Sequence, residues 1–455
     1  MRRMSAALLM PLLILLGTLS LAPIAGAAIP PEGSWEWTQP YTAAATLSTF
    51  RGLAAGPAGS VYVCGDAWDW RWTVSRVDAA TGAEIWTDTR LGPGGTGASA
   101  VAMVSDRQRN LFVLGRAQAG DGNFYLVKYS PTGAVLWQRS WDGPLHLEDR
   151  PTSVAVTRTG DVYVAGMIGK PVGYDDAVLL KYDSAGHLKW KYITATSLYD
   201  SFDEVACDAY GNAYLTGQRA GSMASAQMIT LKVGSTGHLV WQRAITGLGV
   251  SYNGQHLRVK GPAVYVTGAL YKNGMWPIVA KYSLAGKKAW ATAGDGTVES
   301  IDDMAVDAKG RVVTVGSFKA SPGPTLITTA ELLVFAANGK GLDASMMFYA
   351  DYGPSNEYAT RFNRVVVCPD GTMYAAGAWE TNASGTEGNA LVARIPAIET
   401  PLWSGVDKIW RYDGVAGGVD EFWALLRLSD TEIYAAGTQH TGGGSQAFAH
   451  RITLP

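Results

Sequence analysis

Acidic residues recur along this 455-residue chain, each time just before a short apolar segment. They are Glu148-Asp149, Asp203-Glu204, Asp302-Asp303, Glu357 and Asp420-Glu421. Carboxylate oxygens are the ligands that Ca²⁺ prefers, and a group of them can also hold a basic ligand. Asp149, Asp203, Asp302 and Asp420 are therefore candidate binding residues, with a structural or site calcium ion as one occupant. The alternative, which the pattern favours, is that each carboxylate caps backbone amides of a neighbouring unit or pairs with a basic residue.

A second candidate is aromatic. Trp68, Trp70 and Trp72 alternate along one segment. Indole rings at a loop can grip a glycan or a protein, so Trp68 and Trp70 are candidate binding residues. Trp72 is more typical of packing within a strand.

Other patterns do not support catalysis. Gly92–Gly97 matches the glycine string of dinucleotide-binding sites, but that motif needs a following helix, and an inter-unit loop is expected here. His187 and His238 occupy the same repeat position on separate units, so they should not converge on a metal. The chain contains no His-Glu-x-x-His helix and no Gly-x-Ser-x-Gly elbow. We identify no catalytic residue and no cofactor, and a non-enzymatic role is favoured.

These residues must be positioned by a repeat, which is the strongest feature of the sequence. An aromatic or apolar residue followed three positions later by glycine appears eight times. The glycines are Gly65, Gly115, Gly166, Gly217, Gly268, Gly316, Gly377 and Gly437, and they are called the core glycines below. A basic residue also recurs, at Arg76, Lys128, Lys181, Lys232, Lys281, Arg394 and Arg451. One basic residue per unit indicates a repeated structural ion pair rather than an anion site.

Each unit predicts four short strands. In the third unit they are Thr152–Thr157, Asp161–Met167, Asp176–Asp183 and His187–Ile193. A four-stranded unit of this size is typical of a propeller blade. The sequence thus predicts an all-β fold, a single eight-bladed β-propeller of antiparallel blades, with seven blades as the alternative. The predicted blades are 48–92, 98–143, 150–195, 203–246, 255–294, 302–350, 360–412 and 421–455 plus 34–39.

The two ends of the chain support a closed ring. The eighth unit lacks an outer strand, while Ser34–Gln39 resembles the Trp-containing outer strands of other units. We expect this segment to pair beside Ala447–Thr453 and complete the last blade.

The N-terminus predicts export. Arg2 and Arg3 precede an apolar run from Ala6 to Leu21, and small residues follow at Ala25–Ala27. Residues 1–27 are therefore expected to be a cleaved signal peptide, and residues 28–455 the propeller. The mature chain is then secreted or held in the cell envelope, without a membrane span.

Cys64, Cys207 and Cys368 fall in blades one, four and seven, so buried thiols rather than disulfides are expected. The formal net charge of −2 and the lack of a cluster of basic residues indicate that the protein does not bind nucleic acid.

The repeat resembles a known family. Lys128-Tyr-Ser-Pro-Thr-Gly-Ala-Val-Leu-Trp137 is similar to the bacterial SBBP-type β-propeller repeat. Val77-Asp-Ala-Ala-Thr-Gly-Ala-Glu-Ile-Trp86 also looks like a quinoprotein-type or BamB-like repeat. The SBBP resemblance implies an exported or cell-surface protein with no shared enzymatic activity. The quinoprotein resemblance implies a quinone cofactor, but the adjacent cysteines that accompany it in alcohol-oxidising enzymes are absent.

The function expected from the sequence is that of an exported, non-enzymatic binding or scaffold module that acts through the variable loops of one face. Its ligand, a protein or a glycan, is not identified, and we expect a monomer. Two alternatives stay open. One is a propeller enzyme, such as a quinoprotein-like oxidoreductase or a glycan lyase or hydrolase. The other is a BamB-like component of cell-envelope assembly.

Overall fold

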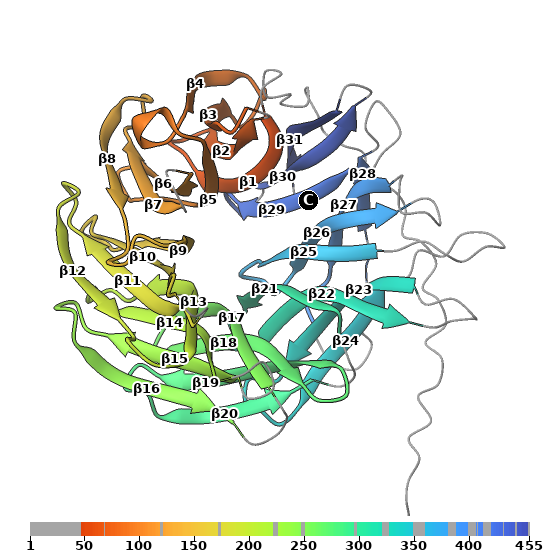
Figure 1. The fold of residues 1–455 in the computed structure, drawn as a ribbon. Helices are drawn as coiled ribbons and strands as arrows, with labels where there is room; N and C mark the ends of the chain where they lie inside the picture. Colours follow the sequence, from red (N-terminus) through yellow and green to blue (C-terminus); the bar gives the residue numbers. More distant parts are fainter. Residues whose placement is uncertain are drawn as a thin grey trace, which may run out of the picture.

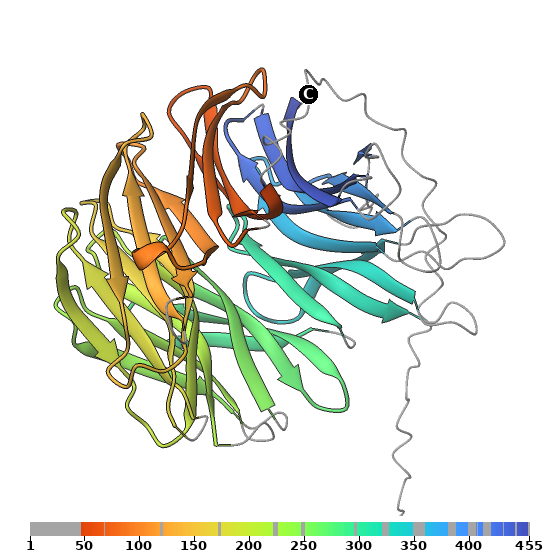
Figure 2. The ribbon, with the colours of Figure 1, turned by 45° about the horizontal axis from the view of Figure 1, so that its top comes forward.

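The computed structural model has eight antiparallel sheets arranged as blades around a central channel (Figures 1 and 2). It describes residues 47–67, 69–118, 122–171, 174–221, 226–246, 251–294, 298–320, 327–348, 360–380, 388–398, 406, 408–412, 420–430, 432–441 and 444–453. The prediction of an eight-bladed all-β propeller is confirmed, and the seven-bladed alternative is excluded. Among the described residues, no helix has the length and apolar character needed to cross a bilayer.

The first four blades have four strands each, ordered along the chain from the channel outward. Blade 1 contains β1 (Leu47–Ala55), β2 (Ser60–Ala67), β3 (Trp72–Asp78) and β4 (Glu84–Arg90). A short 3₁₀ turn, η1 (Pro93–Gly95), leads to blade 2, with β5 (Ala98–Ser105), β6 (Leu111–Ala117), β7 (Asn123–Tyr129) and β8 (Val135–Trp141). Blade 3 contains β9 (Asp149–Val156), β10 (Val162–Ile168), β11 (Asp176–Tyr182) and β12 (Leu188–Ile193). Blade 4 contains β13 (Tyr199–Cys207), β14 (Ala213–Ala220), β15 (Gln227–Val233) and β16 (Leu239–Ile245).

The remaining blades continue the ring. Blade 5 contains β17 (Ser251–Lys260), β18 (Ala263–Tyr271), β19 (Met275–Ser283) and β20 (Lys288–Ala293). Blade 6 contains β21 (Ser300–Val306), β22 (Val312–Ala320), β23 (Ile327–Phe335) and β24 (Leu342–Phe348). Blade 7 contains β25 (Thr360–Val367), β26 (Met373–Glu380), β27 (Gly388–Ile395) and β28 (Lys408–Tyr412). Blade 8 has three described strands, β29 (Glu421–Arg427), β30 (Glu432–Thr441) and β31 (Gly444–Thr453).

The middle strands carry the core. Every residue of β10 and β11 is buried, because each blade is covered on both faces by its neighbours. The outer strand β12 instead has only exposed and half-buried side chains. These patterns explain why the middle strands are nearly continuous apolar runs, whereas the outer strands carry polar residues.

The core glycines have a common structural cause. All eight inner strands contain a β-bulge beside the core glycine of the second strand. At Gly217 a Cβ atom would lie 2.0 Å from the carbonyl oxygen of Ser201, so only glycine admits the bulged backbone. The same collision, with a different inner-strand carbonyl, arises at Gly115, Gly166, Gly268, Gly316, Gly377 and Gly437.

Neighbouring blades are joined at the rim by a contact that we call the rim clasp. Trp137 Nε1 and Lys128 Nζ, both in blade 2, each donate a 3.1 Å hydrogen bond to the carbonyl oxygen of Ser184 in blade 3. The turn residue Gly186 lies against this indole, and a Cβ there would come within 2.8 Å of it. Equivalent indole bonds run from Trp86 to Pro131, Trp190 to Ser235, Trp241 to Leu284 and Trp290 to Ala337.

The rim clasp bears on the basic series. A structural role is confirmed for four residues of the series, Arg76, Lys128, Lys181 and Lys232. Each of them donates a hydrogen bond to a backbone carbonyl of the next blade. Carboxylate partners are added at some positions, such as Asp161 at 3.0 Å from Lys181 Nζ. The expected ion pair is therefore secondary to the carbonyl bond.

Blade 8 packs directly on blade 1 and closes the ring. Phe50 and Val63 of blade 1 share a buried cluster with Ala424 and Tyr434 of blade 8. The Phe50 amide also donates to Thr438 Oγ1 at 3.3 Å. The segment Ser34–Gln39, the expected fourth strand of blade 8, and the signal peptide 1–27 lie outside the described residues. Cys64, Cys207 and Cys368 carry free thiols, as expected.

Candidate functional site

The bulges of the inner strands place several side chains at the central channel. Six of these bulge residues line a single cavity of about 340 Å³: Arg51, Val101, Thr152, Asp203, Gln255 and Trp423. A cavity of this size is in the range of small-molecule sites. The same bulge that requires the core glycine thus builds the lining of the channel.

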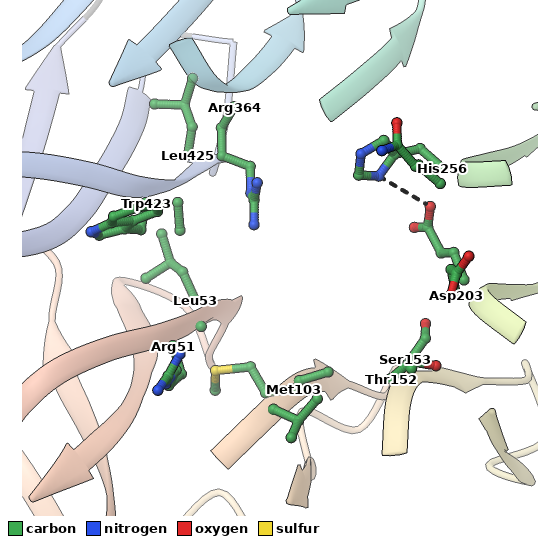
Figure 3. Close-up of a pocket in the computed structure, with 16 residues that line it drawn as sticks. Arg51, Leu53, Met103, Thr152, Ser153, Asp203, His256, Arg364, Trp423 and Leu425 are labelled. Carbon is green, nitrogen blue, oxygen red and sulfur yellow. Dashed lines mark ion pairs between the residues drawn. The ribbon is translucent and has the colours of Figure 1, made fainter. Parts of the chain in front are cut away.

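The cavity has two chemically different walls (Figure 3). The apolar wall comes from blades 8, 1 and 2 and consists of Leu53, Val101, Met103, Trp423 and Leu425. The polar wall comes from blades 3, 4 and 5 and consists of Thr152, Ser153, Asp203, Glu204, Gln255 and His256. Figure 3 shows Arg364 of blade 7 pointing into the opening between them.

The apolar wall is unusually accessible for its residue types. Trp423 keeps 41% of its surface exposed, and its neighbour Leu425 is half-buried. A tryptophan held open at a cavity offers a large apolar surface that a ligand can cover.

The polar wall contains unsatisfied groups. Gln255 Oε1 is buried and accepts no hydrogen bond from any described residue. Burial raises the pKa of Asp203 to about 7, while Ser201 and the charge of His256 act in the opposite direction. An acceptor without a donor favours a ligand that donates hydrogen bonds, and a cationic group beside Asp203 would favour the ionised form of its carboxyl.

Other acids in and behind the polar wall are committed to structure. Burial opposes ionisation of Glu204, but the charge of Arg258 and hydrogen bonds from His256 and Leu257 hold its pKa at about 2. Glu204 accepts from the Leu257 amide of the next blade at 2.6 Å and from Arg258 at 2.6 Å. Arg258 also donates to Asp303 at 2.8 Å. This chain of bonds ties blades 4, 5 and 6 together.

The two arginines at the cavity differ in their partners. Arg51 Nε is 2.9 Å from Asp66 and so is already ion-paired. Arg364 donates only to backbone carbonyls, those of Asp302 at 3.1 Å and Asn363 at 2.7 Å, and no carboxylate of the described chain lies within 4 Å of it. Arg364 is therefore available to an anionic group.

The four acidic candidates from the sequence do not form one cluster. Asp203 lines the cavity, and Asp302 occupies the equivalent bulge in blade 6, where burial raises its pKa and Ser300 Oγ donates to it at 2.5 Å. Asp149 is buried and accepts from the Gly143 amide at 2.6 Å, and burial raises its pKa to about 6. Asp420 is also buried, and its amide donates to the Gly388 carbonyl at 2.9 Å. Asp149 is the first residue of β9 and Asp420 immediately precedes β29, so both come before the bulge, and neither lines the cavity.

The tryptophan candidates separate as well. Trp72 is fully buried and stacks on Tyr125 with ring centroids 5.0 Å apart, as expected for strand packing. Trp70 is 62% exposed, with a left-handed backbone (φ 60°). Its carbonyl accepts from the Ala98 amide at 2.7 Å, which fixes the loop to blade 2. Trp68 lies outside the described residues.

The described residues offer no group of metal ligands. In the part of the chain that the structure describes, no three His, Cys, Asp or Glu side chains are arranged to hold a metal ion. His187 is paired with Asp183 at 3.1 Å on the exposed rim. The calcium site stays a prediction from the sequence.

Several cavity residues were not singled out in the sequence: Gln255, His256, Arg364 and Trp423. Their types differ from blade to blade, so the repeat hides them. Their positions could have identified them: Gln255 and Trp423 are bulge residues, His256 and Arg364 follow a bulge residue, and the bulge precedes each core glycine at a nearly constant distance.

Comparison with known proteins identifies no family. No family model and no curated protein matches the chain. A subtype N10 neuraminidase-like protein of A/little yellow-shouldered bat/Guatemala/060/2010 matches over 80% of this chain and 97% of its own, at 10% identity and a TM-score of 0.42. Prolyl oligopeptidase B from Galerina marginata covers 90% and 56%, at 10% identity and a TM-score of 0.45. A quinohemoprotein alcohol dehydrogenase from Pseudomonas putida covers 87% and 65%, at 10% identity and a TM-score of 0.38. At this level of likeness neither a family nor an activity follows, and the SBBP resemblance stays one of motifs.

Proposed function

We propose that this protein is an exported, non-enzymatic binding module that takes its ligand in the central cavity. The observation that carries the proposal is the two-walled lining: an exposed Trp423 faces Asp203 and an unsatisfied Gln255 across an open space. A site with a large apolar surface and a few oriented polar groups is typical of ligand recognition.

Binding is favoured over catalysis because the reactive side chains near the cavity are already engaged. Ser153 Oγ accepts from the Val205 amide at 3.2 Å, so it is a link between blades 3 and 4. His256 Nε2 lies 3.3 Å from the Ile301 carbonyl, and its Nδ1 is 3.6 Å from Glu204. A nucleophile with a base aimed at it would favour an enzyme. Neither a propeller enzyme nor a BamB-like assembly role gains a specific observation here.

The variable loops expected to form the binding face include Ser317–Thr325 and Ala378–Gly388, most of which lie outside the described residues. They follow the second strands, which end beside the starts of the inner strands.

The proposal can be tested with a small-molecule fragment library and the mature chain. Binding would be followed by ligand-observed NMR and by thermal stabilisation. We expect hits that lose at least about tenfold in affinity in Trp423→Ala, since an aromatic contact of this kind contributes on the order of 1.4 kcal/mol. Trp70→Ala is the matched control, because it removes an exposed indole outside the cavity, and it should leave affinity unchanged. The proposal would be refuted if the library gave no hits, or if the hits bound Trp423→Ala as tightly as Trp70→Ala.

A further inference from the structure

The charges around the cavity are paired, with two exceptions. Glu204 and Asp303 both contact Arg258, and Arg51 contacts Asp66. Among the described charged side chains that line the cavity, Asp203 and Arg364 alone have no opposite charge within 4 Å. One is an acid in blade 4, the other a base in blade 7, and they do not contact each other.

Unpaired charges of opposite sign in one cavity indicate a ligand that carries both complements. The Asp203 carboxylate and the Gln255 Oε1 acceptor suit an ammonium group, which has three donors. The Arg364 guanidinium suits a carboxylate, which it can hold through two parallel hydrogen bonds. Figure 3 shows Asp203 on one side of the opening and Arg364 pointing into it from another, so a bridging ligand would lie across the channel.

The apolar wall sets the third requirement. Trp423, Leu53 and Met103 lie beside the space between the two charges. A ligand that carried only charges would leave this wall in water, whereas an aliphatic or aromatic group would cover it.

We infer that the cavity binds a small zwitterion with an apolar side chain, namely a free apolar amino acid or a short peptide with free termini. Its ammonium group contacts Asp203 and Gln255, its carboxylate contacts Arg364, and its side chain packs on Trp423, Leu53 and Met103. This inference rests on the proposed function and specifies the ligand class of the same site.

The test uses isothermal titration calorimetry with the mature full-length protein and four matched probes. L-phenylalanine has all three groups, 2-phenylethylamine lacks the carboxylate, 3-phenylpropanoate lacks the ammonium, and L-serine lacks the apolar side chain. We expect L-phenylalanine to bind at least about tenfold more tightly than each of the other three. The dipeptide glycyl-L-phenylalanine distinguishes the two sources, since tighter binding of the dipeptide would indicate a peptide ligand.

Two variants test which protein side chain binds each charged group of the ligand. Arg364→Gln should weaken L-phenylalanine at least about tenfold and leave 2-phenylethylamine unchanged, because that probe has no carboxylate to lose. Asp203→Asn should weaken L-phenylalanine and leave 3-phenylpropanoate unchanged. Arg107→Gln and Asp343→Asn are matched controls at exposed positions outside the cavity.

The inference would be overturned if 2-phenylethylamine, 3-phenylpropanoate or L-serine bound the wild-type protein as tightly as L-phenylalanine does. This comparison does not depend on the folding of any variant. If no amino acid or dipeptide binds while Trp423-dependent fragments do, the zwitterion inference fails and the binding module stands. If neither class binds, both fail.

Discussion

The polar and apolar walls of the channel use the same backbone differently. In the polar wall, the residue after the bulge bonds to an amide of the next blade: Ser153 to Val205, and Glu204 to Leu257. In blades 8, 1 and 2 the same position holds Ala424, Gly52 and Ala102, which have no side chain to make this bond. The backbone bulge is thus common to the ring, whereas the bonds between inner strands are concentrated on one side.

The difference between the two walls shows how one propeller can place polar groups at its channel while its blades stay closely packed. Beneath the polar groups that face the lumen, a second layer of side chains hydrogen-bonds to the next blade and joins the blades. Where small residues occupy the second layer, the blades approach closely and larger apolar side chains face the cavity: a Cβ at Gly52 would lie 2.9 Å from Met103.

The largest expected effect comes from breaking the feature that both walls share. In Gly268→Ala the new Cβ would lie 1.8 Å from the Asn253 carbonyl, so the bulge of blade 5 cannot form. We expect a loss of about 4 kcal/mol or more in the free energy of unfolding, measured by urea titration. Gly115→Ala, in blade 2, should cost a similar amount, since its Cβ would lie 2.5 Å from the Ser99 carbonyl.

Gly261→Ala is the control for this prediction. Gly261 has a left-handed backbone (φ 56°) with open space around it, so only conformational strain of roughly 1 kcal/mol is expected. If Gly268→Ala were no worse than this control, the bulge would not be the reason for the core glycines.

The next effect concerns the junction of blades 8 and 1, on the apolar side. If Ser34–Gln39 supplies the fourth strand of blade 8, deletion of Gly33–Pro40 removes an outer strand that contains two tryptophans. We expect a loss of about 3 kcal/mol, with a matching fall in the melting temperature. A chain that lacks only Pro30–Glu32 should melt like wild type. Unchanged stability after the longer deletion would show that this segment does not close the ring.

The second layer of the polar wall is tested by Glu204→Gln. This change leaves Arg258 with Asp303 as its remaining acid partner, so a loss of roughly 2 kcal/mol at pH 7 is expected. The folded-state pKa of Glu204, about 2, is below its ordinary value of 4.5, so its contribution is present above pH 4.5 and is lost as pH falls toward 2. Urea titrations at pH 7, 4 and 3 should show the variant converging on wild type. Asp69→Asn, at an exposed pair with Arg71, should show almost no difference at any pH.

The smallest predicted effect is a gain. Glu331 is buried in β23 beside Gly316, and burial raises its pKa to about 8. Its raised folded pKa means that wild-type stability falls as pH rises from 4.5 to 8. Glu331→Gln should therefore stabilise the protein by at least about 1 kcal/mol at pH 9 and by almost nothing at pH 4.5. Parallel stability profiles for the two proteins between these pH values would contradict the prediction.

The fold was readable from the sequence because repetition averages out local ambiguity. The four strands predicted for blade 3 correspond to β9–β12, since the same turn glycines and aromatic residues recur in other units. The bulge itself was not predicted. It changes the alternation of the inner strand by one residue, so Asp203 and Glu204 are both used, one in the cavity and one between blades.

The site was less readable for the same reason. Asp203 was identified, but Asp149 was grouped with it although it precedes the bulge and is buried against Gly143. Arg364 and Trp423 were missed because a ligand site is made of residues that differ between blades. Repetition, which reveals the scaffold, says little about such positions.

The rim clasps also give the ring a mechanical direction. Each indole reaches forward to the next blade, from Trp86 in blade 1 to Trp290, whose acceptor Ala337 is in blade 6. Under a force that pulls the two ends of the chain apart, the load on blades 1 to 6 would be shared by five such bonds, one at each boundary. Among the described residues, the boundary after blade 6 shows no tryptophan clasp; there Arg311 Nη1 donates to the Ile398 carbonyl of blade 7 at 3.1 Å, so an arginine carries the load in place of an indole.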